Sequence, residues 1–238
     1  AVGLAGCTGD GDTETIVPGT SSGFAPFEYI EEETNELVGF DVDLAVDAIE
    51  RAGYEAGDWV DIEFDSLIPS LTEGDIDLIA AAMTITDDRD EQIDFTDPYY
   101  EADQAVLVRE DDIDPAEFAD LEGRPVGAQS GTTGEVTVEE ELVSPGLIDG
   151  DAARSYGNYV FAVNDLESGN VDAVVVDTPV AETFAGDRPV RVAFVFETGE
   201  RYGLGLRDGD DRVGDINDAL TEIQEDGTYD DLVSEYFE

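Results

Sequence analysis

The stretch Leu78–Arg89 reads LIAAAMTITDDR and indicates how this chain folds. Its first part, Leu78–Ala82, is a short run of apolar residues, which is typical of a strand buried on both faces. The part that follows is polar and contains Thr84 and Arg89. In open α/β sheets, ligands bind beyond the carboxyl ends of the strands. The stretch therefore predicts a buried strand that ends at a candidate binding site.

Helices and strands are predicted to alternate on both sides of this stretch. Apolar residues at helical spacing, early acids, a late arginine and a final glycine predict a helix over Phe40–Gly53. Further strands are predicted at Thr15–Thr20, Val60–Phe64, Gln104–Val108, Arg124–Gln129 and Val171–Val176, and further helices at Leu67–Thr72 and from Thr132 or Thr133. This alternation predicts an α/β fold, and a chain of 238 residues is long enough for two cores.

The composition is strongly acidic. The chain has 61 Asp and Glu residues, ten basic residues that are all arginine, no histidine, and a formal net charge of -51. This charge argues against binding to nucleic acid or to an anionic membrane surface, because both would be repelled at moderate salt. Surface carboxylates in such excess suit molar salt, where the Debye length falls to about 3 Å, so we interpret the chain as halophilic. The hydrophobic content of 41% argues against a disordered acidic chain.

The first residues resemble the end of an export signal. The tetrapeptide Leu4–Cys7, LAGC, is similar to the lipobox of exported lipoproteins, and a polar run follows it. This similarity implies a lipid anchor on Cys7, a flexible tether within residues 1–14, and a position on the extracellular face of the cell membrane. The alternative is a chance cysteine in an apolar remnant. A single cysteine excludes an internal disulfide, and no apolar run reaches the roughly 20 residues that span a bilayer.

Polar groups suited to a zwitterion follow the ends of three predicted strands. These groups are Thr84 and Arg89 after the first strand, Thr132 and Thr133 after the second, and Asp177 after the third. A guanidinium matches a carboxylate through two parallel hydrogen bonds, and the free N–H groups of a helix start add donors. Asp177 could accept an ammonium. Ordinary alternatives remain, because Arg89 could form a solvated ion pair with neighbouring acids and Asp177 could cap a helix.

An ordered set of short motifs resembles one known family over nearly the whole chain. The motifs are Phe24–Phe27 (FAPF), Gly39–Leu44 (GFDVDL), Ser66–Leu71 (SLIPSL), Gly74–Asp77 (GDID), Thr84–Arg89 (TITDDR), Ile93–Tyr100 (IDFTDPYY), Gly131–Thr133 (GTT), Asp172–Val174 (DAV) and Asp226–Tyr229 (DGTY). They are similar to the extracellular solute-binding proteins of polar amino-acid ABC transporters, the family 3 type that includes glutamine-binding and lysine/arginine/ornithine-binding proteins.

The resemblance implies the type II periplasmic-binding-protein fold. This fold has two α/β lobes, each with a central sheet flanked by helices, and two hinge crossings join the lobes. We place the crossings around Tyr99–Asp103 and Thr198–Tyr202. The first lobe is then expected to comprise residues 15–100 and 202–238, and the second lobe residues 101–201. Binding of ligand would close the lobes about the hinge.

The resemblance also assigns roles to individual residues. Arg89 and Thr84 would hold the α-carboxylate of an amino acid, with help from the N–H of Thr133 at the helix start that includes Thr132. Asp177 and the carbonyl of Ala82 would hold its α-ammonium. The remaining residues implied are Phe24 and Phe64, which would flank the ligand side chain, and Ser21, Ala81 and Gln129, which would lie at its polar end.

Ser21 departs from the pattern of the family. Relatives that bind basic amino acids or glutamine commonly carry an acid at this position, so a cationic ligand is less supported. A site built to hydrogen-bond a polar side chain rejects analogues that lack the group. Ser21 and Gln129 together favour a neutral polar amino acid such as glutamine, while asparagine, histidine, glutamate and small amino acids remain open.

We therefore expect a monomeric binding protein that delivers an amino acid to an ABC transporter permease, with no catalysis, cofactor or metal of its own. The lack of histidine excludes a Ser-His-Asp arrangement, and the single cysteine, Cys7, lies in the expected anchor. Two alternatives stay open. One is an enzyme of the same fold that resembles cyclohexadienyl or arogenate dehydratase, and the other is a ligand-sensing module.

Overall fold

The computed structural model describes residues 13–238. The predicted lipid anchor, Cys7, and most of the predicted tether lie outside the described residues. Among the helices of the described part, none is both long and apolar enough to cross a membrane.

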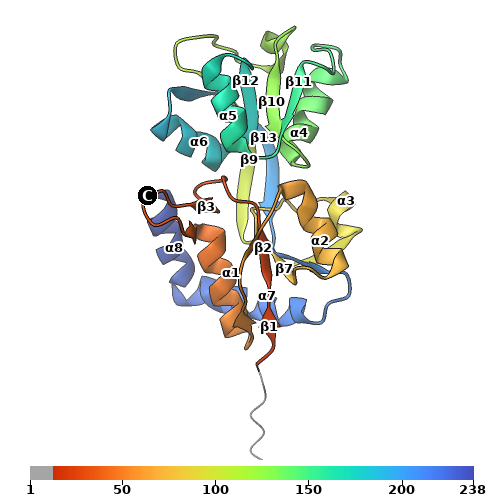
Figure 1. Cartoon of the computed structure of the whole chain (residues 1–238), viewed down its shortest axis with the longest axis vertical. Helices are drawn as coiled ribbons and strands as arrows, with labels where there is room; N and C mark the ends of the chain where they lie inside the picture. The colour runs from red at the N-terminus through yellow and green to blue at the C-terminus, as the bar shows by residue number, and fades with distance from the viewer. Residues whose placement is uncertain (1–12) are drawn as a thin grey trace, which may run out of the picture.

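The chain forms two lobes, each built around a five-stranded sheet (Figure 1). The sheet of the first lobe has the strand order β6 (Val60–Asp61), β2 (Pro18–Thr20), β7 (Leu78–Ile79), β14 (Gly205–Arg207) and β8 (Ile93–Phe95). Its helices are α1 (Phe40–Arg51), α2 (Leu67–Glu73), α3 (Asp87–Asp90), α7 (Arg212–Asp226) and α8 (Thr228–Phe237). Two small sheets pair β1 (Thr15–Ile16) with β5 (Glu55–Ala56), and β3 (Tyr29–Ile30) with β4 (Leu37–Val38).

The second lobe has the strand order β11, β10, β12, β9 and β13. The bounds are β11 (Ala153–Tyr156), β10 (Val126–Gln129), β12 (Ala173–Asp177), β9 (Tyr100–Arg109) and β13 (Val190–Tyr202). Its helices are α4 (Thr133–Val138), α5 (Tyr159–Ser168) and α6 (Thr178–Asp187), with a π-helical turn at Glu139–Val143 and a 3₁₀ turn at Phe118–Leu121. The expected two-lobed α/β fold is confirmed.

Two long strands connect the lobes. β9 and β13 pair along most of their length, and in Figure 1 they run from the second lobe toward the first. Their ends meet where Tyr100 pairs with Tyr202. The predicted crossings, Tyr99–Asp103 and Thr198–Tyr202, lie on these strands, and the limits of the lobes stay a prediction.

Strand direction places loops from both lobes at one cleft. In the first lobe β2 is parallel to β6 and β7, and in the second β10 is parallel to β11 and β12. The carboxyl ends of parallel strands lie at the same edge of a sheet, so the segments that follow β2, β7, β10 and β12 converge. These segments carry the residues that the sequence singled out.

Several strands are shorter than the sequence predicts. The predicted strand Leu78–Ala82 ends as β7 at Ile79, because the chain turns at Ala82, whose φ is 44°. The predicted strand Val60–Phe64 ends at Asp61, because Phe64 begins a 3₁₀ turn, Phe64–Ser66, that leads into α2. Ala82 and Phe64 therefore lie outside the sheet, in segments that reach the cleft.

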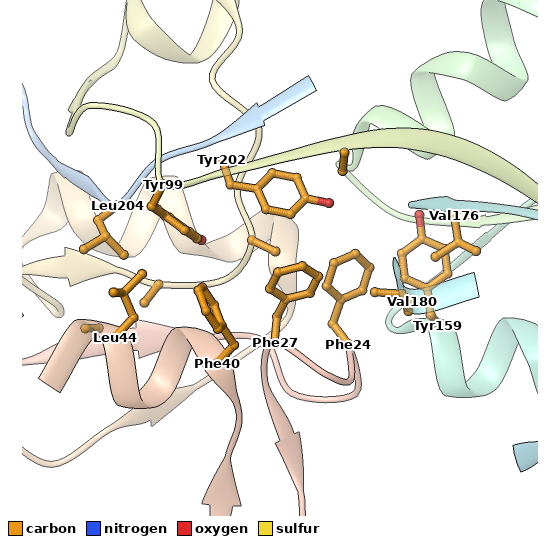
Figure 2. Packing of buried hydrophobic residues seen from close by; sticks show 14 of the residues in the cluster. Phe24, Phe27, Phe40, Leu44, Tyr99, Tyr159, Val176, Val180, Tyr202 and Leu204 are labelled. Atoms are coloured by element: carbon orange, nitrogen blue, oxygen red, sulfur yellow. The ribbon is translucent and has the colours of Figure 1, made fainter. Parts of the chain in front are cut away.

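A buried aromatic row crosses from one lobe to the other (Figure 2). Phe40 of α1 packs edge-on against Phe27, and Phe27 stacks on Phe24 with ring centroids 6.0 Å apart. Phe24 in turn contacts Tyr159, the first residue of α5, at 5.5 Å. Because Tyr159 belongs to the second lobe, the hydrophobic core is continuous between the lobes next to the cleft.

Candidate functional site

One cavity between the lobes is lined by every residue that the sequence assigned to ligand binding. These residues are Ser21, Phe24, Phe64, Ala81, Ala82, Thr84, Arg89, Gln129, Thr132, Thr133 and Asp177. Glu28 and Tyr159 also line the cavity, and the sequence analysis did not select them. Most of the lining side chains are buried, so the lobes are closed around the cavity.

Arg89 extends across the cleft. It lies in the short helix α3, whose N-cap Thr86 accepts a hydrogen bond from the N–H of Arg89. Its guanidinium donates to the carbonyl of Thr84 at 2.7 Å and to the carbonyl of Gly131, in the other lobe, at 3.0 Å. It also lies over the ring of Phe64, 5.3 Å from the centroid.

Arg89 makes no ion pair among residues 13–238, so the alternative of a solvated pair with neighbouring acids is not observed. The residue is 9% exposed, and burial lowers the pKa of its guanidinium while the charges of Glu200 and Asp177 raise it. A buried cation that donates only to neutral carbonyls is suited to an anionic ligand group.

Asp177 is the last residue of β12 and lies before α6, but its side chain does not cap that helix. One carboxylate oxygen accepts a hydrogen bond from the hydroxyl of Tyr202 at 2.5 Å, and the other accepts from the amide of Gln104. Burial, followed by the charge of Glu200, raises the pKa of Asp177 to about 7. The carboxylate keeps free lone pairs toward the cavity, where a cation would stabilise its charged form.

The carbonyl of Ala82 is positioned by a buried acid that the sequence did not identify. Asp41, in the first turn of α1, accepts hydrogen bonds from the N–H of Ala82 at 2.7 Å and from the hydroxyl of Tyr99 at 2.6 Å. Non-glycine residues seldom adopt a positive φ, and the bond from its N–H to Asp41 helps to hold Ala82 at 44°. Asp41 thus connects the loop after β7 to the start of a predicted hinge crossing.

The start of α4 closes the cavity from the second lobe. Thr132 is the N-cap residue, and its hydroxyl accepts a hydrogen bond from the N–H of Glu135 and donates to the carbonyl of Gln129 at 2.7 Å. The N–H of Thr133 is among the first of the helix, which have no partner inside a helix. It is therefore available to an acceptor in the cavity.

Ser21 and Gln129 contact each other in the wall of the cavity. The amide of Gln129 lies 3.4 Å from the hydroxyl of Ser21 and 3.3 Å from the carbonyl of Gly157. Ser21 follows β2 and Gln129 ends β10, so this contact also crosses the cleft. Hydroxyl and amide groups can each donate and accept, which fits a polar ligand side chain.

Glu28 is a buried acid on the cavity wall. It is 1% exposed, and its oxygen Oε2 has no hydrogen-bond partner within the described residues. Burial, followed by the charge of Asp41, raises the pKa of Glu28 well above its usual range. An unpartnered buried carboxyl group costs free energy, so a donor from a ligand would be stabilising here.

The chain is similar to known proteins over most of its length. The sequence profile of the bacterial extracellular solute-binding proteins, family 3, matches residues 16–238. The chain is 33% identical over 252 residues to a probable histidine-binding protein of Neisseria gonorrhoeae, covering 100% of this chain and 91% of the relative. It is 34% identical to the ABC transporter arginine-binding protein 1 of Escherichia coli K12, covering 94% of this chain and 91% of that protein.

Two solved structures of similar shape are amino-acid-binding proteins. An ancestral arginine-binding protein bound to glutamine superposes with a TM-score of 0.87 at 36% identity, over 95% of this chain and 99% of that one. The ancestral amino acid-binding protein AncCDT-1, a precursor of cyclohexadienyl dehydratase, superposes with a TM-score of 0.85 at 34% identity, over 94% and 96% of the two chains.

Proposed function

Since this chain belongs to the bacterial extracellular solute-binding proteins of family 3, we propose that it binds a polar L-amino acid in the cavity between its lobes and delivers it to an ABC transporter permease. It is a binding protein, as are the relatives with histidine and arginine in their names. The structural neighbour related to cyclohexadienyl dehydratase is itself described as amino acid-binding, so it does not favour an enzyme here.

The observation that carries this proposal is the pair of Arg89 and Asp177 in one closed cavity. Arg89 is buried without an acidic partner among the described residues, and Asp177 is buried without a cationic one. A zwitterion supplies both partners at once. Its α-carboxylate would accept from Arg89 and from the N–H of Thr133, and its α-ammonium would donate to Asp177 and to the carbonyl of Ala82.

The ligand side chain would lie between Phe24 and Phe64 and end near Ser21, Gln129 and Glu28. Glu28 changes the expected choice of ligand, because Ser21 alone favoured a neutral side chain over a cationic one. Its free acceptor favours a side chain that ends in N–H donors, and a buried carboxylate is stabilised most by a cation. We propose arginine and glutamine as the two ligands to test first, with arginine requiring ionised Glu28.

A thermal-shift panel of the common L-amino acids tests this proposal. A ligand at about 100 times its dissociation constant stabilises a protein by about 2.7 kcal/mol, which raises the unfolding midpoint by roughly 5–10 °C for a chain of this size. We expect such shifts with arginine, glutamine or both, and none with aspartate. A folded sample whose midpoint responds to no amino acid would rule the proposal out.

Glu28→Gln separates the two candidate ligands. Removing the charge should reduce the shift with arginine more than the shift with glutamine, because an amide can pair with an amide but cannot neutralise a guanidinium. Glu32→Gln is the matched control, since Glu32 lies in an exposed turn. Equal losses with both ligands would argue against a contact between Glu28 and the ligand side chain.

The family is extracellular, and we propose further that this protein is a monomer anchored to the cell membrane by a lipid on Cys7. The support for the anchor is the sequence LAGC, which lies outside the described residues. Mass spectrometry of the protein purified from its own membranes tests the anchor, since an unmodified Cys7 thiol would contradict it. Light scattering in molar salt tests the monomer.

A further inference from the structure

Glu200 lies on the connecting strand β13 and its carboxylate reaches both lobes. Its oxygen Oε2 accepts hydrogen bonds from the hydroxyl of Thr84 at 2.6 Å and from the hydroxyl of Thr133 at 2.8 Å. Its oxygen Oε1 accepts from the amide of Gln104 at 3.1 Å. Thr84 belongs to the first lobe and Thr133 to the second, so one carboxylate oxygen joins the two sides of the cleft.

A bulge in β13 places Glu200 at this position. Phe196 pairs with Gln104 and Glu200 pairs with Ala102, so the three residues 197–199 lie opposite the single residue Asp103. Asp103 stabilises the bulge, because its carboxylate accepts the N–H groups of Thr198 and Gly199, each at 2.8 Å. Bulges next to binding sites redirect side chains, and this one turns Glu200 toward the cavity.

The carboxylate of Glu200 determines the direction of the hydrogen bonds around it. An ionised carboxylate only accepts, so each threonine hydroxyl must donate its single hydrogen to Glu200. The hydroxyl of Thr84 then presents its lone pairs to the cavity and is an acceptor for a ligand. This assignment differs from the role that the family resemblance gave Thr84, which was to hold the α-carboxylate.

We infer that Glu200 is a positioning residue for ligand binding, which orients the Thr84 hydroxyl as an acceptor for the ligand ammonium and holds the two lobes together on the hinge side of the cavity. The inference rests on the proposed function. Both hydroxyls share one oxygen of Glu200, so a rotation that separates the lobes must break one of the two bonds. The same carboxylate also places a negative charge beside Asp177.

Isothermal titration calorimetry of four variants tests the inference, with L-arginine and L-glutamine as probes in about 2 M KCl. Glu200→Met removes both acceptor oxygens from a side chain of similar length, so the hydroxyls of Thr84 and Thr133 and the amide of Gln104 all lose this partner. We expect roughly tenfold weaker binding, and a similar loss in Thr84→Val. The double variant should bind as weakly as Thr84→Val and no weaker, because Glu200 acts through that hydroxyl.

Glu197→Met is the matched control, since it makes the same change at an exposed position on β13. We expect it to bind as the original chain does. Additive losses in the double variant, or unchanged binding in Glu200→Met, would overturn the inference while the proposed function stood. If the unmodified chain binds neither probe, the proposed function fails first. Unfolding midpoints of the ligand-free variants separate a loss of binding from a loss of folding.

Discussion

Replacement of Arg89 by methionine should abolish most of the binding while leaving the chain folded. Arg89 is 9% exposed and lines a cavity between the lobes. If it pairs with the ligand carboxylate there, Arg89→Met leaves that carboxylate buried without a cation. Removing one partner of a buried ion pair costs about 3–5 kcal/mol, which corresponds to binding weaker by about two to four orders of magnitude.

The fold should be less affected than the affinity. The substitution removes the hydrogen bonds from Arg89 to the carbonyls of Thr84 and Gly131, but it also removes the cost of burying a charge. Methionine retains an unbranched apolar stem that can pack on Phe64. These opposing contributions should leave the ligand-free unfolding midpoint close to that of the original chain.

Isothermal titration calorimetry with L-arginine and L-glutamine measures the loss. Arg154→Met is the matched control, because it removes the same charge from an exposed position on β11. A folded Arg89→Met variant that binds within tenfold of the original chain would refute the assignment of Arg89 to the ligand carboxylate. A loss of equal size in Arg154→Met would point to a general charge effect instead.

Four further predictions concern the pH dependence of affinity, the pH dependence of stability, lobe closure and salt. The ammonium of a ligand needs ionised Asp177, whose pKa burial raises to about 7, so calorimetry should show affinity falling by up to about tenfold per pH unit below pH 7. The stability of the ligand-free protein should change in the opposite direction with pH. The Asp177 carboxylate binds a proton more tightly in the folded chain than in the unfolded chain, so the unfolding free energy should rise as pH falls from about 7 toward 4. Gly131→Ala should weaken binding roughly tenfold, because the φ of Gly131 is +75° and an added Cβ would lie 2.9 Å from the Cβ of Asp65 in the other lobe. Gly146→Ala is the control and should leave affinity unchanged, because Gly146 has a similar φ of +79° but open space around it. The unfolding midpoint at neutral pH should rise between about 0.1 M and 2 M KCl, because salt screens the repulsion of a net charge of -51, and a midpoint independent of salt would contradict the halophilic interpretation.

Part of the site could be predicted from short segments, and the rest, Ser21, Phe24, Phe64, Ala81, Ala82 and Gln129, came from the family resemblance. Arg89 and Asp177 follow apolar strands, and strand ends of an α/β sheet lie at the cleft. The sequence of α1 has apolar residues at helical spacing, acids in its first turn and a glycine just after its end, so the predicted bounds are close to the observed ones. Strand ends alone left open the competing roles of Arg89 and Asp177, an ion pair and a helix cap. The family resemblance favoured ligand binding instead, and within residues 13–238 Arg89 makes no ion pair and the Asp177 side chain does not cap α6.

The residues that the sequence did not reveal depend on tertiary geometry. Glu28 and Asp41 are two of 61 acids, and nothing in their local sequence shows that each is buried. Glu200 points to the cavity because a bulge of three residues lies opposite Asp103, and strand alternation alone does not predict a bulge. The turn at Ala82 likewise depends on a hydrogen bond to Asp41, which is 41 residues away in sequence.

The most direct test of the central claim is equilibrium dialysis of the chain against radiolabelled L-arginine and L-glutamine in about 2 M KCl, with Arg89→Met measured in parallel. We predict saturable binding of at least one of the two at one molecule per chain, and little binding by the variant at the same concentrations. Saturable binding that persists undiminished in Arg89→Met would place the ligand outside this cavity. No binding of either amino acid by the folded chain would contradict the assignment of the cavity to a zwitterion.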